Sequence, residues 1–171
     1  NPCGRWVSCF NPTYVHFIFN STHLLMTYLA DTNILLRLKQ TSHPLHLSAL
    51  QGVKTLKKRS EKLYIVPQNL IEFWVVATRP VKVNGLGLSF EQATLEIEDI
   101  KHIFSLYQDT PAIYPQWERL IRKYQVMGKK SHDARLVAAM ITHNIDNILT
   151  FNTDDFLRYS EIIPVDPRTI H

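Results

Sequence analysis

The sequence predicts an α/β fold in which helices cover both faces of a mostly parallel sheet. Short apolar segments alternate along the chain with longer segments of helical periodicity. The apolar segments show no regular alternation of polar and apolar residues, which is typical of strands buried on both faces. The chain has 171 residues, of which 45% are hydrophobic, so it is long enough to form one domain with a substantial core.

The predicted strands are short apolar runs separated by helical or turn-forming sequence. The clearest runs are "TYLA", "LYIV" and "NILTF". The run "AIY" and the segment "EIIPVDP" are expected to form two further short strands. In chain order, the expected strands lie within residues 27–30, 63–66, 112–114, 147–151 and 161–167.

The predicted helices follow from apolar periodicity and from residues that start or end helices. Ser89 and Gln92 have the spacing of a capping box, and Ser131 is a candidate N-cap. Pro80 ends another predicted helix, and the glycine-containing segment 81–89 after it is expected to be a loop. In chain order, the expected helices begin with "NILLRL" after the first strand and continue with residues 45–62, 68–79, 90–108, 115–126 and 131–144.

Charge and cysteine content limit the classes of function. The net charge of +4 permits a nucleic-acid partner without establishing one. The only cysteines are Cys3 and Cys9, which argues against a disulfide framework, a zinc site and a cysteine nucleophile. Such a composition suits a reducing, cytoplasmic compartment.

Residues 1–25 differ in composition from the rest of the chain. They contain a single charged residue, Arg5, among scattered prolines, asparagines and aromatic residues. They contain no apolar run near the roughly 20 residues that a membrane span needs, and no small-residue cleavage site follows their apolar stretch. We expect residues 1–25 to be an upstream extension and the domain to occupy residues 26–171, with Met26 as the natural start.

Four acidic residues stand in apolar surroundings. Asp31 follows the first predicted strand, and Glu72 is the only polar residue in "LIEFWVVA". Asp133 lies in the first turn of the helix before the strand "NILTF", and Asp155, with Asp154 beside it, follows that strand. Because the carboxyl ends of parallel strands meet at one edge of a sheet, where sites form, we expect these acids to gather there. The position of Asp133 is the least constrained by the pattern.

Each acid taken alone has an ordinary structural explanation. Asp31 is a good helix cap, Glu72 and Asp133 would be favoured by a helix dipole, and the two neighbouring aspartates are common turn formers. Taken together they are harder to explain, because two carboxylates roughly 4 Å apart repel by about 4 kcal/mol at an effective dielectric constant near 20. Protonation or a bound cation would relieve that repulsion. Oxygen ligands without cysteine favour Mg²⁺ or Mn²⁺ over zinc, and metal-dependent phosphodiester hydrolysis follows as a chemical class.

The ordered motifs "YLADTNILLRL", "IEFWVVATRP…NGLGLS", "GKKSHDARLVAAM" and "ILTFNTDDF" resemble a PIN domain, specifically the VapC-type toxin ribonucleases of type II bacterial toxin–antitoxin systems. The resemblance covers about residues 26–168 and implies a three-layer α/β/α sandwich. It implies three metal ligands, a fourth and less constant acid with one substitute, and several supporting residues. In that order these are Asp31, Glu72 and Asp133; Asp155 with Asp154; and Thr32, Asn33, Thr150 and Asn152.

The resemblance also implies partners and a cofactor. Members of this family cut RNA with Mg²⁺ or Mn²⁺, are commonly homodimers, and are held silent by a small cognate antitoxin protein. Arg79, Lys129 and Lys130 are candidate phosphate contacts, although exposed lysines without a role remain the alternative for the pair 129–130.

Two other readings stay open at the level of sequence. One is a catalytically degenerate PIN domain that serves as an RNA-binding or protein-binding module, although all four acidic positions are filled. The other is a phosphatase with Asp31 as its nucleophile, but Asn33 stands where a second aspartate is usual.

Overall fold

The computed structural model describes residues 25–171. The prediction that residues 1–25 form an upstream extension concerns residues that, except for Leu25, lie outside the described part of the chain. Within the part of the chain that is described, no helix combines the length and the apolar character needed to cross a membrane.

The centre of the fold is a five-stranded sheet in which all neighbouring strands are parallel. The strand order is β3-β2-β1-β4-β5, so β1 is the middle strand and pairs with β2 and β4. This confirms the predicted parallel sheet. The strands are β1 (Thr27–Ala30), β2 (Lys62–Ile65), β3 (Ser105–Leu106), β4 (Asn147–Leu149) and β5 (Ile163–Val165).

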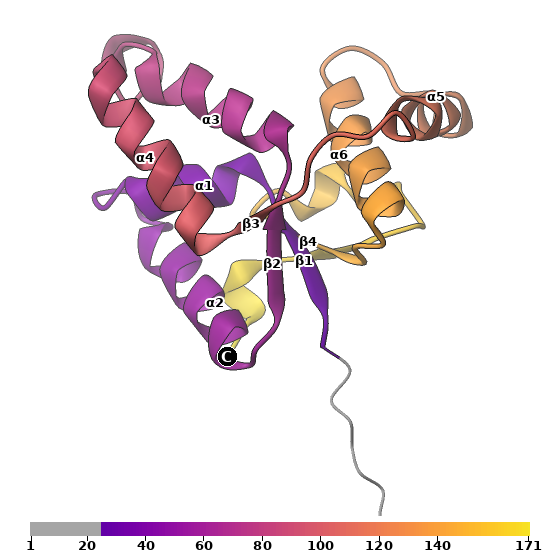
Figure 1. Ribbon diagram of the computed structural model, residues 1–171, viewed down its shortest axis with the longest axis horizontal. Coiled ribbons are helices and arrows are strands. Elements are labelled where there is room, and N and C mark those ends of the chain that lie inside the picture. Colours follow the sequence, from indigo (N-terminus) through magenta and orange to yellow (C-terminus); the bar gives the residue numbers. More distant parts are fainter. Residues whose placement is uncertain (1–24) are drawn as a thin grey trace, which may run out of the picture.

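Helices form a layer on each side of the sheet (Figure 1). Helices α1 to α4 pack on one face, and α5 and α6 pack on the other, which gives the predicted three-layer arrangement. The α-helices are α1 (Thr32–Lys39), α2 (His46–Lys58), α3 (Pro67–Thr78), α4 (Phe90–Ile103), α5 (Ile113–Lys123) and α6 (Lys130–His143). Within residues 25–171, the short 3₁₀ segments are η1 (Val81–Val83), η2 (Thr153–Asp155) and η3 (Pro167–Thr169).

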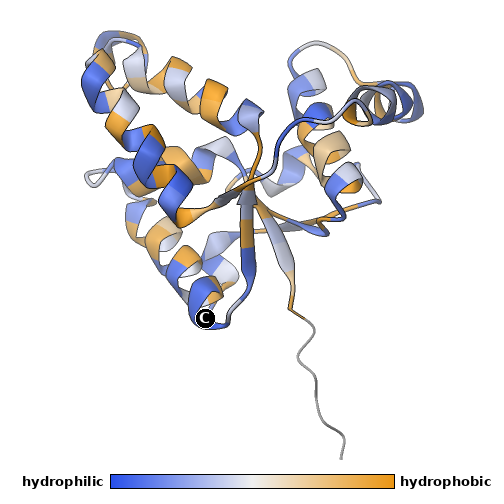
Figure 2. Cartoon of the chain, in the orientation of Figure 1, coloured by the Kyte–Doolittle hydropathy of each residue, from blue (hydrophilic) through white to orange (hydrophobic). Residues whose placement is uncertain are grey.

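Alternating strand residues divide the core between the two layers. In β1, Tyr28 and Ala30 join the cluster under α1 to α4, whereas Leu29 joins the cluster under α5 and α6. In β4, Ile148 and Leu149 likewise go to opposite clusters. Because successive side chains point to opposite faces and both faces are covered, these five residues are all buried and hydrophobic. The covering helices carry interleaved hydrophilic and hydrophobic residues (Figure 2), as expected of helices with one face in water.

Three local predictions of secondary structure were wrong or displaced. The expected strand at 112–114 is wrong, because Ile113 is the first residue of α5. Pro115 lies in the first turn of that helix, where its missing N–H leaves no helical hydrogen bond unmade. The third strand is instead Ser105–Leu106, within the region expected to continue the helix 90–108, since α4 ends at Ile103.

The start of α6 also differs from the prediction, whereas the start of α4 agrees with it. The N-cap position of α6 is Lys129, without a side-chain cap, so Ser131 is not the cap and lies inside the helix. At α4 the Ser89–Gln92 capping box is confirmed: the Gln92 N–H donates to Ser89 Oγ (3.2 Å), and the Ser89 N–H donates to Gln92 Oε1 (2.9 Å).

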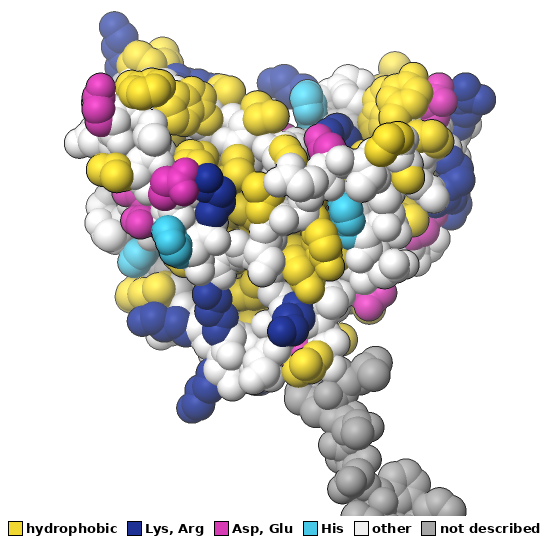
Figure 3. Space-filling model, in the orientation of Figure 1, with side chains coloured by type: hydrophobic (Ala, Val, Ile, Leu, Met, Phe, Trp, Pro, Cys, Tyr) yellow, Lys and Arg dark blue, Asp and Glu magenta, His cyan; other side chains and the backbone are white. Residues whose placement is uncertain are grey.

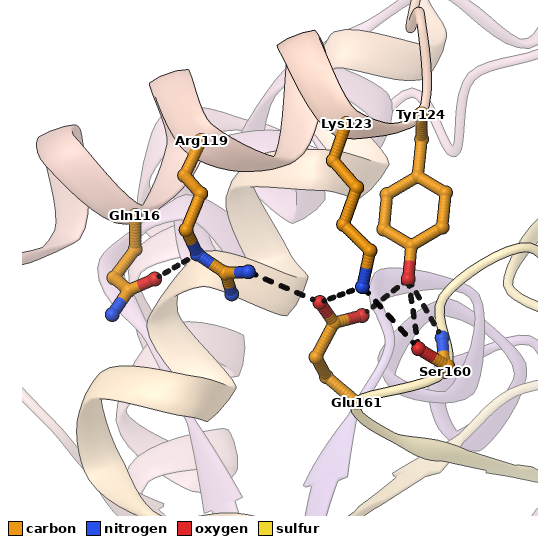
Figure 4. Close-up of polar contacts among 6 residues, drawn as sticks. All are labelled: Gln116, Arg119, Lys123, Tyr124, Ser160 and Glu161. Atoms are coloured by element: carbon orange, nitrogen blue, oxygen red, sulfur yellow. Dashed lines mark hydrogen bonds and ion pairs between the residues drawn. The ribbon is translucent and has the colours of Figure 1, made fainter.

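A charged cluster ties α5 to the segment before β5 (Figure 4). Glu161 accepts hydrogen bonds from Lys123 Nζ (2.9 Å), Tyr124 Oη (2.7 Å) and Arg119 Nη1 (3.3 Å). The Tyr124 hydroxyl also accepts from the backbone N–H of Ser160 (3.0 Å). This acid therefore has two basic side chains of the same chain as direct partners.

The last residues of the chain pack against α2. A Cβ added at Gly52 would lie 3.0 Å from Cβ of Pro167, so the absence of a side chain in the middle of α2 gives η3 room to pack closely. The Arg59 guanidinium donates to the backbone carbonyl of His171.

Candidate active site

Asp31 is held at the carboxyl edge of the sheet by backbone hydrogen bonds that continue beyond the strands. Its N–H donates to the carbonyl of Leu149 (2.9 Å), and the N–H of Thr150 donates to the carbonyl of Val165 (3.0 Å). Asp31 and Thr150 therefore sit side by side where β1 and β4 end. This edge opens into a notch between the two helical layers, where acidic, basic and histidine side chains gather (Figure 3).

The side chain of Asp31 does not act as a helix cap. Asp31 occupies the N-cap position of α1 but makes no side-chain capping hydrogen bond. Its Oδ2 instead accepts from Asn33 Nδ2 (2.6 Å) and from Thr150 Oγ1 (2.7 Å), and Asn33 Nδ2 also donates to Thr150 (2.9 Å). Asn33 is fixed in turn, because its Oδ1 accepts from the N–H of Phe151 (3.2 Å). Two neutral donors thus orient this carboxylate.

Burial raises the pKa of Asp31 from 3.8 to about 6. Hydrogen bonds from Thr150 and from the backbone of Thr32 work against this rise, whereas the negative charges of Glu72 and Asp133 add to it. The residue is 9% exposed. Asp31 is therefore a buried acid whose pKa is raised further by two acids from distant parts of the chain.

Glu72 is held by neutral side chains as well. Its Oε2 accepts from Thr32 Oγ1 (2.7 Å), and its Oε1 accepts from Gln68 Nε2 (2.8 Å). Of the two residues expected to support Asp31, Thr32 or Asn33, it is Asn33 whose side chain contacts Asp31, and the hydroxyl of Thr32 contacts Glu72. Buried Asn69 lies beneath this pair: its Nδ2 donates to Thr32 (3.4 Å), and its Oδ1 accepts from the N–H of Val66 (2.9 Å).

We call the four predicted acids, Asp31, Glu72, Asp133 and Asp155, the acid group. Asp133 and Asp155 form its second half, and Lys130 lies between them. Lys130 Nζ donates a hydrogen bond to Asp155 Oδ1 and lies 3.9 Å from Asp133 Oδ2. Burial raises the pKa of Asp133; the positive charge of Lys130 lowers it in part, and the charges of Asp155 and Glu72 raise it further. The four predicted acids are thus linked electrostatically: Asp31 with Glu72 and Asp133, and Asp133 with Asp155.

The other predicted site residues are less closely associated with these acids. Asp154 is exposed, and the acid of this turn that acts on Asp133 is Asp155. Asn152 is exposed, and its backbone N–H donates to Thr150 Oγ1 (3.0 Å). Lys129 is exposed at the N-cap of α6. Arg79 follows the end of α3, about 10 Å of helix rise beyond Glu72.

Sequence reasoning missed a polar chain that joins α3 to α6. Gln68 Nε2 also donates to the carbonyl of His132 (3.0 Å), while its Oε1 accepts from Arg135 Nη1 (3.0 Å). Arg135 Nη2 donates in turn to Asp109 Oδ2 (2.7 Å). A signal for Gln68 was present, since residues four apart share a helix face and Gln68 stands four before Glu72. No local pattern indicated Arg135.

The side chains of the acid group are of the chemical type that binds a hard divalent cation, but in this structure they are not arranged around one common point. Among residues 25–171, no three or more histidine, cysteine, aspartate or glutamate side chains are arranged so that they could hold a metal ion as they stand. The available ligands are carboxylate oxygens with hydroxyl and amide neighbours, which Mg²⁺ and Mn²⁺ prefer. Burial is the main cause of the raised pKa values of Asp31 and Asp133, and the negative charges of neighbouring acids add to it.

Comparison with known proteins shows to which family the chain belongs. The family model described as "PIN domain" matches residues 28–162. The chain belongs to the PIN domain family. Members of this family are typically nucleases and generally use divalent metals. No curated protein sequence matches the chain significantly.

Solved structures share this PIN fold at low sequence identity. VapBC2 from Rickettsia felis, bound to a DNA fragment from their promoter, matches with a TM-score of 0.62 and 16% identity over 82% of this chain and 98% of that one. VapBC-1 from nontypeable Haemophilus influenzae matches with a TM-score of 0.60 and 17% identity over 83% and 98%. VapC20 from Mycobacterium tuberculosis, described as a Sarcin-Ricin loop cleaving toxin, has a TM-score of 0.55 and 18% identity over 76% and 93%. This PIN domain is therefore similar in fold to VapC toxins.

Proposed function

We propose that this protein is a Mg²⁺- or Mn²⁺-dependent endoribonuclease that hydrolyses RNA phosphodiester bonds and serves as the toxin of a toxin–antitoxin pair. The observation that carries the proposal is Asp31. It is buried at the end of the middle strand, its hydrogen-bond partners Asn33 and Thr150 are neutral, and its pKa is raised by burial and by two more acids. Perturbed acids converging on one edge of an α/β sheet are typical of catalytic sites.

The acids would divide the work between holding the cation and shaping the site. Asp31, Glu72 and Asp133 would be the ligands, with Asp155 as a fourth acid. A bound divalent cation supplies Lewis-acid charge at a phosphodiester and activates water. Thr150 and Asn33 orient Asp31, and Thr32 and Gln68 orient Glu72, because each donates to one of its oxygens. Such supporting hydrogen bonds hold ligands in the deprotonated, inward-facing form.

The structural neighbours support the proposed partners. Several are toxin–antitoxin assemblies, among them the complex from Klebsiella pneumoniae, and the neighbour VapC20 is described as cleaving the Sarcin-Ricin loop. We accordingly propose RNA as the substrate, a small antitoxin as the inhibitor, a homodimer as the assembly state and the cytoplasm as the site of action. Expression with and without a candidate antitoxin would test the pairing by growth.

The decisive test is cleavage of total RNA by purified protein with added Mn²⁺, comparing the wild type with Asp31→Asn. Asparagine keeps the acceptor for Asn33 and Thr150 but removes the charge. We expect cleavage to fall by more than the roughly 10–100-fold typical of changes outside the ligand set. The matched control is Asp154→Asn, which removes an exposed acid nearby and should leave cleavage unchanged. Wild-type cleavage by Asp31→Asn would refute the assigned role.

A second candidate function is a non-catalytic PIN domain that binds RNA or protein. The observation that favours it is that no three acids stand ready to share an ion among the described residues. Calorimetric titration with Mn²⁺ separates the two: an enzyme should take up the ion in a manner abolished by Asp31→Asn, whereas a pure binding module should show no acid-dependent uptake.

A further inference from the structure

Lys130 places a positive charge inside the acid group. It is the first residue of α6, so its side chain lies on the same helix face as that of Asp133, three positions later. The 3₁₀ segment η2 brings Asp155 to the other side of the ammonium. From the sequence, Lys130 is a candidate phosphate contact; in the structure its ammonium lies beside two carboxylates.

The two halves of the acid group are compensated in different ways. Asp31 and Glu72 accept from threonine, asparagine and glutamine side chains, which carry no charge. Asp133 and Asp155 share Lys130. The side chains of Lys130, Asp155 and Asp133 are 40%, 37% and 25% exposed, so solvent reaches this half more easily. The ammonium reduces the joint charge of these two aspartates from −2 to −1.

A second divalent ion would have to occupy the place that this ammonium already fills. Two-metal nuclease sites hold their ions roughly 3.5–4 Å apart between shared carboxylates. Lys130 Nζ donates a hydrogen bond to Asp155 and lies 3.9 Å from Asp133 Oδ2, so an ion entering between these two aspartates would meet the ammonium at close range. Like charges at such separations repel strongly even at intermediate dielectric constants.

We propose that the Lys130 ammonium stands in for a second metal, so that the site takes one divalent ion, which Asp31, Glu72 and Asp133 hold. This inference rests on the proposed function, because it presumes that the acids bind a cation. It makes Lys130 a residue that sets the number and affinity of bound ions through charge.

The test is calorimetric titration of the full, EDTA-stripped chain with MnCl₂, with no RNA present. Lys130→Met keeps the length of the side chain and removes its charge, and Lys130→Arg keeps the charge. The matched control is Lys129→Met, which removes the same charge from the neighbouring exposed residue. We expect one ion per chain for the wild type, Lys129→Met and Lys130→Arg. For Lys130→Met we expect a second ion or roughly tenfold tighter uptake of the first.

The outcomes that would overturn the inference differ from those that would overturn the proposed function. Two ions bound by the wild type, or identical stoichiometry and affinity for Lys130→Met and Lys129→Met, would overturn the inference and leave the nuclease proposal standing. No uptake by any variant would overturn both. Lys130→Gln is a second uncharged variant for use if the methionine variant melts below the wild type, and the same result is expected of it.

Discussion

Two acids of this protein with little exposure to solvent, Glu161 and Asp31, are compensated in opposite ways. Glu161 accepts from Lys123, Tyr124 and Arg119 (Figure 4). Burial alone would raise the pKa of Glu161, but the hydrogen bonds from Tyr124 and Lys123 outweigh it, and the pKa is lowered. Asp31 has neutral donors and acidic neighbours, and its pKa is raised to about 6.

The difference separates an ionised acid that stabilises the fold, Glu161, from one that destabilises it, Asp31. Ionised Glu161 links α5 to the segment before β5, and its charge is balanced on the spot. Ionised Asp31 is desolvated without a balancing charge among its hydrogen-bond partners, which lowers stability. Such locally unfavourable arrangements are expected at functional sites. Asp133 is intermediate, because Lys130 compensates part of its charge.

The largest expected effect is a gain of stability on neutralising Asp31. Between 3.8 and about 6, the difference in pKa corresponds to about 3 kcal/mol at neutral pH. Asp31→Asn should therefore raise the free energy of unfolding by up to about that amount at pH 8 in EDTA, while abolishing cleavage. Urea denaturation measures it, and an Asp31→Asn protein less stable than the wild type would contradict this account.

The pH dependence of the wild type tests the same contrast. The folded-state pKa of Asp31 lies above its unfolded value, so the folded protein binds the proton more tightly. This contribution to stability is complete below about pH 4 and is lost as the pH rises through about 6. Glu161 acts in the reverse direction, because its lowered pKa gives stability that is lost on acidification.

The sign can be checked by following stability in EDTA from pH 5 to 8. The wild type should lose stability over this range, Asp31→Asn should lose much less, and saturating Mn²⁺ should flatten the profile of the wild type by holding Asp31 ionised. A wild type whose stability rises throughout this range would break the comparison.

A smaller effect of opposite sign is expected at Glu161. Glu161→Gln weakens charge-assisted hydrogen bonds from Lys123 and Arg119, which typically contribute about 1.5–3 kcal/mol when partly buried and less when exposed. Since Lys123 and Arg119 are about half exposed, we expect a loss of about 1 kcal/mol. Thermal denaturation measures it, with Mn²⁺ uptake and RNA cleavage unchanged as the control.

The smallest effect is expected for Arg119→Ala. The Arg119–Glu161 contact is 3.3 Å long, and Arg119 is 46% exposed, so its loss should change the free energy of unfolding by less than about 0.5 kcal/mol. A change above 1 kcal/mol would mean that the cluster in Figure 4 is cooperative, and a double-mutant cycle with Glu161→Gln would measure that coupling.

The sequence predicts those elements whose formation depends on their own residues. It misses those that form only because a neighbouring element of the fold is there to pair with them. The runs that became β1, β2 and β4 are apolar without alternation, and their burial on two faces explains both their detection and their parallel pairing. The strand Ser105–Leu106 has two residues and no pattern of its own. It exists because Tyr64 and Ile65 of β2 are there to pair with it.

The same distinction holds at the site. That Asp31 and Asp155 lie near one edge follows from strand direction, which the sequence indicates. Which side chain contacts which acid depends on side-chain rotamers and on how α3 packs near α6. Neither can be inferred from the spacing of residues in the sequence. Hence the sequence left open whether Thr32 or Asn33 would support Asp31, and it did not indicate that Lys130 would bond to Asp155.

The packing of η3 against α2 has a practical consequence. Because Gly52 admits Pro167 and Arg59 holds the carbonyl of His171, the final residue lies near the start of β2, at the opposite end of the strands from Asp31 (Figure 1). A tether attached to His171 would leave the notch facing away from a sensor surface. Immobilised protein could then meet long RNA molecules without steric hindrance from its support.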